Sequence, residues 1–206
     1  MRDYPHRDDY YIVALLTHGS AALEIDFERI CVGTGEILIV SPCQVHRRPS
    51  GEEWRADGWM LAVSPEFLSA KETVALDAYS ISPHPLNPGQ STVDDIVALC
   101  TMYERYSRDA GIAGPIASAI KSIVVAAVGK CDSGAIGRYM AITLDFRKLI
   151  DKHLTLEKSP AAYASMLNIS EVYLNEAVKG ATGQSAGAYL RSRIIVEAKR
   201  LLAYTS

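Results

Sequence analysis

The sequence predicts an α+β protein in which a small β-barrel or sandwich is followed by helices. Three observations lead to this class. Short apolar or alternating runs broken by Gly and Pro fill residues 10–68, two long apolar helical patterns follow, and a helix-turn-helix pattern lies near the end of the chain. A chain of 206 residues with 49% hydrophobic residues can bury a substantial core, and it is long enough for two small domains.

Four or more strands are expected in the amino-terminal part, and many short strands favour a barrel or sandwich. The expected strands are residues 10–17, 22–32, 37–40 and 58–63. The continuous apolar run at 37–40 fits a strand that is buried on both faces. Gly19 is expected to end the first strand, and a turn is expected inside the second.

Two helices are expected after the strands. Residues 69–81 show a mixed pattern, and the three prolines within residues 82–88 favour an extended loop across the sheet. A helix at 92–106 would place Ile96, Leu99, Tyr103 and Tyr106 on one side. A second helix at 115–128 is apolar almost all round, so it should be enclosed by other elements.

The domain boundary is expected in the linker at 129–137, which is rich in small residues. This gives domains 1–137 and 138–206. The formal net charge is -3, but residues 138–206 hold 10 Lys+Arg and 6 Asp+Glu, a balance of +4. The remaining residues hold 11 and 18, a balance of -7, and the two sum to -3. A local basic excess is what a phosphate-facing module needs.

Residues 159–179 predict two short helices joined by a tight turn. Ser159 and Pro160 would start the first helix, Asn168 would take the turn in a left-handed conformation, and Ser170 would cap the second helix. Ala164 would let the helices pass closely. An ordinary helical hairpin shows the same spacing, and this alternative stays open.

The longer helices on either side complete the carboxyl-terminal part. A helix is expected at 138–154, and another at 183–202 with its apolar side chains on one stripe. In a DNA-binding module, the early exposed residues of the second short helix would face the major groove, and nearby cations would contact phosphates. The candidate DNA contacts are Glu171, Tyr173, Asn175, Lys179, Arg191 and Arg193.

Several segments resemble the AraC/XylS family of transcriptional regulators. Residues 167–176 (LNISEVYLNE), 182–185 (TGQS) and 193–202 (RIIVEAKRLL) are similar to the first half of its DNA-binding domain. Residues 5–11, 35–46 and 58–68 are similar to the cupin-type sensing domain of the same family. The resemblance implies a cupin-like barrel that binds a small-molecule effector, with sugars as a common class, and two helices that form a homodimer contact. It also implies a second helix-turn-helix, so the chain is expected to be truncated and to bind DNA weakly.

The candidate effector contacts are His18, His46 and Trp59. For His46, the capping of a loop is the more common role, and an aromatic residue such as Trp59 is more often part of a core. No metal or other cofactor is expected, because His6, His18 and His46 are scattered along the sequence and a metal needs converging ligands.

Other features of the sequence limit which classes of function are possible. Four widely separated cysteines form no Cys-x-x-Cys pair, which favours reduced thiols in the cytoplasm. No signal peptide and no apolar run that could cross a bilayer is expected. The sequence therefore favours a ligand-responsive DNA-binding regulator, not an enzyme. Two alternatives are a cupin-type metal enzyme with a helical appendage and a helix-turn-helix module that binds protein.

Overall fold

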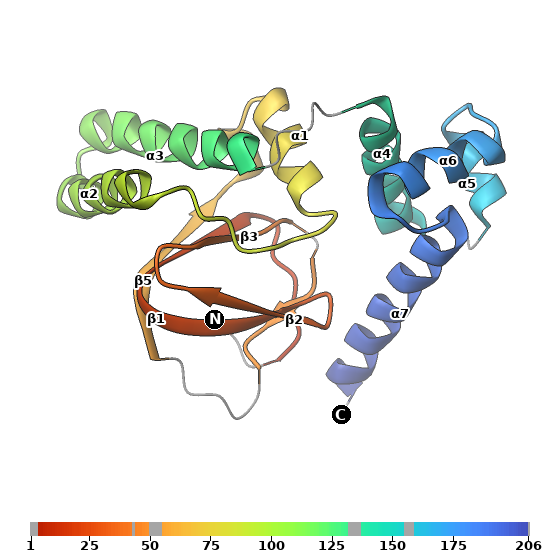
Figure 1. Ribbon diagram of the computed structural model, residues 1–206, viewed down its shortest axis with the longest axis horizontal. Coiled ribbons are helices and arrows are strands. Elements are labelled where there is room, and N and C mark those ends of the chain that lie inside the picture. Colours follow the sequence, from red (N-terminus) through yellow and green to blue (C-terminus); the bar gives the residue numbers. More distant parts are fainter. Residues whose placement is uncertain (1–3, 43, 50–54, 132–136, 155–158, 206) are drawn as a thin grey trace. The chain divides into compact units, whose positions relative to one another are not determined.

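The computed structural model describes residues 4–42, 44–49, 55–131, 137–154 and 159–205. These residues form two compact units, of which the first contains Asp8–Ser133 and the second contains Arg2–Arg7 together with Gly134–Ser206. The described residues of the first unit form an antiparallel sheet and helices α1 to α3, and those of the second form helices α4 to α7 (Figure 1). The predicted α+β class is confirmed. The expected linker at 129–137 is helical up to Cys131, and residues 132–136 lie outside the described part of the chain.

The first unit begins with five strands. They are β1 (Tyr11–Ile25), β2 (Glu28–Gly33), β3 (Ile37–Val40), β4 (His46–Arg47) and β5 (Arg55–Val63). Strand β1 organises the sheet, because each of the other four strands pairs with it in antiparallel register. The short strand β4 was not predicted from the sequence, since His46 and Arg47 carry no apolar pattern.

Strand β1 joins segments that were expected to be separate strands. The expectation that Gly19 ends the first strand is wrong, because β1 continues through it to Ile25. Gly19 has a φ of 78° and lies next to an irregularity of the ladder, because the pairing with β5 shifts between Leu16 and His18. The turn expected inside the second segment is present: Asp26 and Phe27 have φ values of 52° and 68° and join β1 to β2.

Apolar side chains fill both faces of the sheet. Alternate residues of β1 point to opposite faces, as the period of a strand requires. On one face Val13 and Ile39 pack with residues from three helices, and on the other face Ile12 and Leu38 belong to a separate cluster. All four residues of β3 are buried, which confirms the prediction for this strand.

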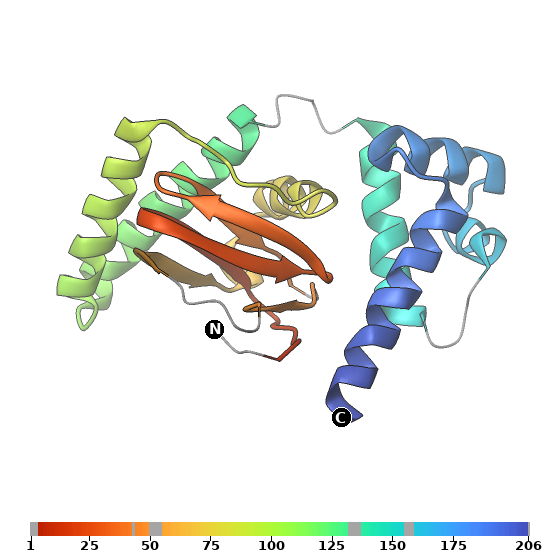
Figure 2. The same cartoon turned by 60° about the horizontal axis from the view of Figure 1, so that its bottom comes forward.

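Helices α1 (Ala70–Tyr79), α2 (Gln90–Tyr106) and α3 (Ala110–Cys131) contribute to the first of these clusters, after a single 3-10 turn at Pro65–Phe67. Figures 1 and 2 show α2 and α3 side by side. Helix α1 was not predicted. Of the side chains expected on one side of this helix, Ile96 is buried, whereas Tyr103 and Tyr106 are 41% and 38% exposed. Helix α2 also buries Val93 and Cys100. The proline-rich loop is extended, and its Leu86 bridges to Ile37.

Helix α3 is longer than expected. Its segment Ala110–Lys130 has a mean hydropathy of 1.8 and is long and apolar enough to cross a bilayer, so the expectation of no such run is wrong. The prediction began at Pro115 and missed the apolar turn before it. The core helix of a folded protein can have the same composition, and α3 packs against α1 and α2 along one face. Of its most apolar window, 33% is buried, so the expectation that α3 is enclosed all round is also wrong.

The second unit consists of four helices. They are α4 (Arg138–His153), α5 (Pro160–Met166), α6 (Glu171–Thr182) and α7 (Ala186–Thr205). Its core contains the fully buried side chains of Phe146, Ile150, Tyr163 and Leu174. The start expected for the last helix is wrong, because Gly183 has a φ of 73° and caps the end of α6. These four helices position the candidate interface with nucleic acid.

Candidate nucleic-acid interface and ligand pocket

Helices α5 and α6 are joined by a tight turn, as expected. Asn168 has a φ of 55°, which confirms the left-handed residue of the turn. The N–H of Ile169 donates to the carbonyl of Ala164 at 3.0 Å, so the chain folds back on the buried end of α5. Ser170 caps α6, because its Oγ accepts from the N–H of Tyr173 at 3.1 Å. Ser159 makes no cap with its side chain.

The start of α6 presents exposed side chains. Glu171 and Lys179 are exposed, as a contact with a major groove requires. Val172, which was not among the predicted contacts, is 71% exposed and stands beside Glu171. An exposed apolar side chain at this place could contact the methyl group of thymine. Its position as the second residue after the cap, Ser170, is the sequence signal that could have identified it.

The side chain of Tyr173 is less exposed than those of Glu171 and Val172. Its ring meets the ring of Tyr139 edge-on, with centroids 6.0 Å apart and planes at 71°. The guanidinium carbon of Arg138 is 5.5 Å from the centroid of the same ring. Tyr173 therefore packs α6 against the start of α4. A base contact would use only the part of the side chain that stays exposed.

Asn175 has a structural partner within the unit. Its Oδ1 accepts from the N–H of Ala186 at 3.1 Å, and Ala186 is the first residue of α7. The first N–H groups of a helix have no partner inside the helix, so the amide of Asn175 satisfies one of them. This side chain fixes where α7 begins relative to α6. The sequence pattern could not reveal this role, since the partner is eleven residues away.

The two predicted phosphate contacts on α7 differ in their surroundings. Arg191 is exposed, whereas Arg193 is 6% exposed and its Nη2 lies 3.2 Å from Oδ1 of Asp151 in α4. Two residues along a helix are about 200° apart, so side chains at this spacing face opposite sides. Arg193 thus ties α7 to α4. Among the predicted contacts, Glu171, Lys179 and Arg191 are exposed, whereas Tyr173 and Asn175 are half-buried and Arg193 is buried.

The first unit contains a cavity of about 590 Å³. It lies between β1, β5 and the helices α2 and α3, and its walls are mostly apolar side chains. The lining includes Val13, Leu61, Leu76, Ile120 and Val124. Volumes of this order hold small molecules, and such pockets commonly combine apolar walls with a few polar groups.

The predicted effector contacts His18, His46 and Trp59 do not line this cavity. His18 is exposed on β1. His46 is 2% exposed, and its Nε2 lies 3.3 Å from Oδ2 of Asp8. Trp59 borders a separate, smaller cavity of about 150 Å³ and also packs against the core. The structure therefore does not bring the three together.

Lys121 supplies the charge at the large cavity. Its Nζ lies 3.1 Å from Oε2 of Glu72 and donates to the carbonyl of Phe67 at 3.2 Å. Glu72 also completes a capping box at the start of α1, because its Oε2 accepts from the N–H of Ser69 at 2.7 Å. The hydrogen bond from the Ser69 backbone, the bond with its hydroxyl and the charge of Lys121 lower the pKa of Glu72 below its ordinary value of 4.5.

The Glu72→Gln variant should lose a small, pH-dependent part of the stability of the first unit. Since the pKa of Glu72 is lower in the folded state, its stabilisation is present above the unfolded pKa of 4.5 and is lost as pH falls through the folded value. At neutral pH we expect a loss of about 0.5 kcal/mol, because solvent screens an ion pair near the surface, where the Glu72 side chain is 21% exposed. Denaturant titrations at several pH values measure the difference, which should shrink below pH 4.5; a difference independent of pH would contradict the assignment.

Comparison with known proteins finds no matching protein-family model and no matching curated protein. Among solved structures, the chain is similar to the AraC-like transcriptional activator CuxR, with 20% identity and a TM-score of 0.44, over 92% of this chain and 67% of that one. It is also similar to ToxT from Vibrio cholerae O395 bound to (E)-4-(8-methylnaphthalen-1-yl)but-3-enoic acid, with 12% identity and a TM-score of 0.31, over 93% of this chain and 96% of that one. Similarity at this level assigns no function to the chain.

Proposed function

We propose that this protein is a DNA-binding transcription regulator that responds to a small molecule. The observation that carries the proposal is the turn between α5 and α6, in which Asn168 is left-handed and Ser170 caps a helix whose first exposed residues are Glu171 and Val172. A helix held in this way can enter a major groove with its amino-terminal end. The basic excess of residues 138–206 favours a partner that carries phosphates.

In this proposal, the exposed residues divide by chemistry. Glu171 accepts from cytosine or other base donors, and Val172 contacts thymine methyl groups. Lys179 and Arg191 contact phosphates, which position the module without reading sequence. Tyr173, Asn175 and Arg193 serve mainly to hold α4, α6 and α7 together, as their internal contacts indicate.

The effector is proposed to bind in the cavity of the first unit. Its mostly apolar lining favours a largely apolar molecule over a sugar, because a sugar would leave hydroxyl groups without partners. Lys121, Ser64 and Ser107 are among the residues that supply polar groups at this cavity. To regulate, the effector must bind one functional state of the protein more tightly than the other. We propose a cupin-like barrel for this unit, in a cytoplasmic protein without catalytic activity.

The chain is proposed to act as a homodimer through α2 and α3. These helices carry large apolar side chains that are exposed to solvent in the single chain, among them Met102, Tyr103, Tyr106 and Ile112. Exposed apolar patches of this kind mark interaction surfaces. Static light scattering of the purified chain measures its mass, and a monomer at high concentration would contradict this part of the proposal.

Binding to a fluorescent DNA duplex at several salt concentrations tests the central claim. We expect the logarithm of the association constant to fall linearly with the logarithm of salt concentration, because phosphate contacts release counterions. The Lys179→Gln and Arg191→Gln variants should each reduce the steepness of that line by about one.

A charge-matched variant separates a local contact from a general effect of charge. Lys71→Gln removes one positive charge from an exposed position on α1 in the first unit, and it should leave the salt dependence unchanged. Equal effects of Lys71→Gln and Lys179→Gln would show that α6 makes no special contact. An absence of binding to any duplex at low salt would favour a module that binds protein instead.

A further inference from the structure

Lys121 brings a positive charge to the cavity of the first unit. Of the described residues that line this cavity, Lys121 is the only one whose side chain is charged at neutral pH. Its Nζ lies 5.0 Å from the centroid of the Phe67 ring, which also lines the cavity, and the lysine side chain is only 17% exposed. A ligand that fills the cavity near Phe67 therefore meets the ammonium group.

The ammonium group requires a hydrogen-bond acceptor from such a ligand, because it has three N–H donors and no acceptor. Within the described part of the chain, two of these donors serve Oε2 of Glu72, at 3.1 Å, and the carbonyl oxygen of Phe67, at 3.2 Å. The third donor can serve a ligand. A protonated amine is disfavoured, since it would bring a second cation to a cavity that has no acidic residue among its described lining.

The two serines of the lining are weaker donors toward a ligand. The hydroxyl of Ser107 donates to the carbonyl of Glu104 at 2.9 Å, and the hydroxyl of Ser64 donates to the carboxylate of Glu66. Each hydroxyl has one proton, so both are already used inside the chain. Lys121 is therefore the donor that selects the polar group of the ligand.

Glu72 decides which charge that polar group carries. Its carboxylate balances the charge of Lys121, and the N–H of Ser69 donates to the same Oε2 at 2.7 Å. Hydrogen bonds with Ser69 and the charge of Lys121 lower the pKa of Glu72, so this group stays ionised at neutral pH. A ligand carboxylate on the same ammonium group would lie close to Glu72, and like charges at short distance repel. A carbonyl oxygen accepts the same N–H without this repulsion.

We propose that the effector of this cavity is an uncharged molecule with an apolar body and a carbonyl acceptor, as in a ketone, an ester or an amide. The inference rests on the proposed role of the cavity as the effector site. The body packs against apolar side chains such as Leu61, Ile120 and Val124, and the carbonyl oxygen accepts from Nζ of Lys121. The volume of about 590 Å³ lies within the range of about 300–1,000 Å³ that is usual for small-molecule sites.

The competing explanation is an anionic effector whose carboxylate replaces Glu72 as the partner of Lys121. Glu72 would then lose its ion pair and keep only its hydrogen bonds with Ser69. Both explanations use Lys121, so a change of this residue alone does not separate them. A change of Glu72 does, because removal of its charge favours an anion and leaves an uncharged ligand nearly unaffected.

Displacement of the uncharged dye N-phenyl-1-naphthylamine from the whole chain tests the proposal. The competitors are decan-2-one, decanoate and decan-1-amine, which share a chain length and differ in their polar group. We expect decan-2-one to bind most tightly. Lys121→Met should weaken its binding by about 10- to 100-fold, the contribution of a hydrogen bond to a charged group. Lys71→Met is the matched control, since it removes an exposed positive charge on α1 outside the cavity lining.

Glu72→Gln gives a second readout that partial unfolding cannot imitate, because the expected result is a gain. It should tighten the binding of decanoate by about 10-fold, since a repulsive charge is removed, and leave decan-2-one nearly unchanged. Ala117→Phe fills the wall of the cavity and should abolish binding of all three competitors, which places them in this cavity. The proposal is overturned if decan-2-one does not displace the dye, if decanoate binds the unaltered chain more tightly, or if Lys121→Met binds decan-2-one as well as Lys71→Met does.

DNA binding, measured separately, distinguishes this proposal from the proposed function. A chain that binds duplex DNA but prefers decanoate would keep the role of a regulator and lose the carbonyl assignment. A chain that binds decan-2-one through Lys121 but binds no duplex at low salt would keep the carbonyl assignment and lose the role of a regulator.

Discussion

Phe146→Ala is expected to destabilise the second unit by about 3–5 kcal/mol, the cost of deleting a fully buried aromatic side chain. Phe146 is 0% exposed at the centre of four helices. Its ring meets Tyr163 edge-on at a centroid distance of 5.4 Å, and it lies 6.1 Å from the ring of Tyr189. The cavity left by alanine would remove the contacts that pack α4 against α5 and α7. DNA binding should therefore fall in proportion to the fraction of folded protein.

The positions of the two tryptophans make this loss measurable in the whole chain. Trp54 and Trp59 both precede Gly134 in the sequence, so tryptophan fluorescence follows the first unit alone. Far-ultraviolet ellipticity follows the helices of both units. In Phe146→Ala, we expect the fluorescence transition to stay in place while part of the ellipticity is lost at lower denaturant concentration.

Tyr139→Ala is the matched control for this experiment. Tyr139 is an aromatic residue on the same helix, but it is 41% exposed, and its ring meets that of Tyr173 edge-on. Its truncation should cost about 0.5–1.5 kcal/mol, the range for an aromatic pair. If Phe146→Ala were no more harmful than Tyr139→Ala, Phe146 would not be the centre of this core.

The helix-turn-helix was predictable because its signals are local. Asn168 at the turn and Ser170 at the cap act on backbone groups within three or four residues of themselves, so their residue types carry the information. Strand β3 was predictable for a similar reason, since a run of four apolar residues has no polar face to expose. The expected break at Gly19 failed because a glycine with positive φ fits a bulge as well as a strand end.

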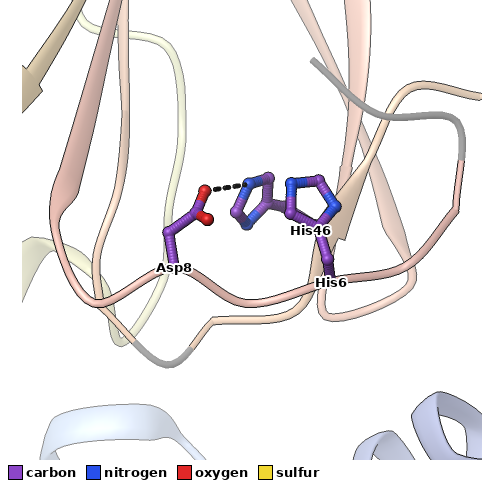
Figure 3. A group of neighbouring side chains, drawn as sticks. All are labelled: His6, Asp8 and His46. Atoms are coloured by element: carbon purple, nitrogen blue, oxygen red, sulfur yellow. Dashed lines mark ion pairs between the residues drawn. The ribbon is translucent and has the colours of Figure 1, made fainter.

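Roles that depend on distant partners could not be read from the sequence. The sequence pattern predicts a base contact for Asn175, but its amide accepts a hydrogen bond from the start of α7. It predicts a phosphate contact for Arg193, but this guanidinium pairs with Asp151. His46 lies 3.3 Å from Asp8, a residue far earlier in the sequence, and no local pattern reveals this contact (Figure 3). Helix α1 does carry a local signal, the capping box from Ser69 to Glu72, which went unrecognised beside a weak apolar pattern.

Ile39→Ala and Leu38→Ala are each expected to destabilise the first unit by about 2–5 kcal/mol. The two residues are neighbours in β3 and point to opposite faces of the sheet. Ile39, which is 0% exposed, packs with the cluster that includes α1, α2 and α3, whereas Leu38, which is 1% exposed, packs with the opposite cluster. Tryptophan fluorescence during denaturant titration measures both losses.

The pair of variants decides whether both faces of the sheet are closed to water. Truncation of a buried side chain leaves a cavity on its own face, so two losses of similar size require two packed faces. Met60→Ala on β5 is the control, because Met60 is 48% exposed and its truncation should cost much less. If only Ile39→Ala were costly, the face that carries Leu38 would be open to solvent. A single-faced sheet of that kind could not form the closed barrel proposed for the sensing unit, because a barrel needs a packed interior.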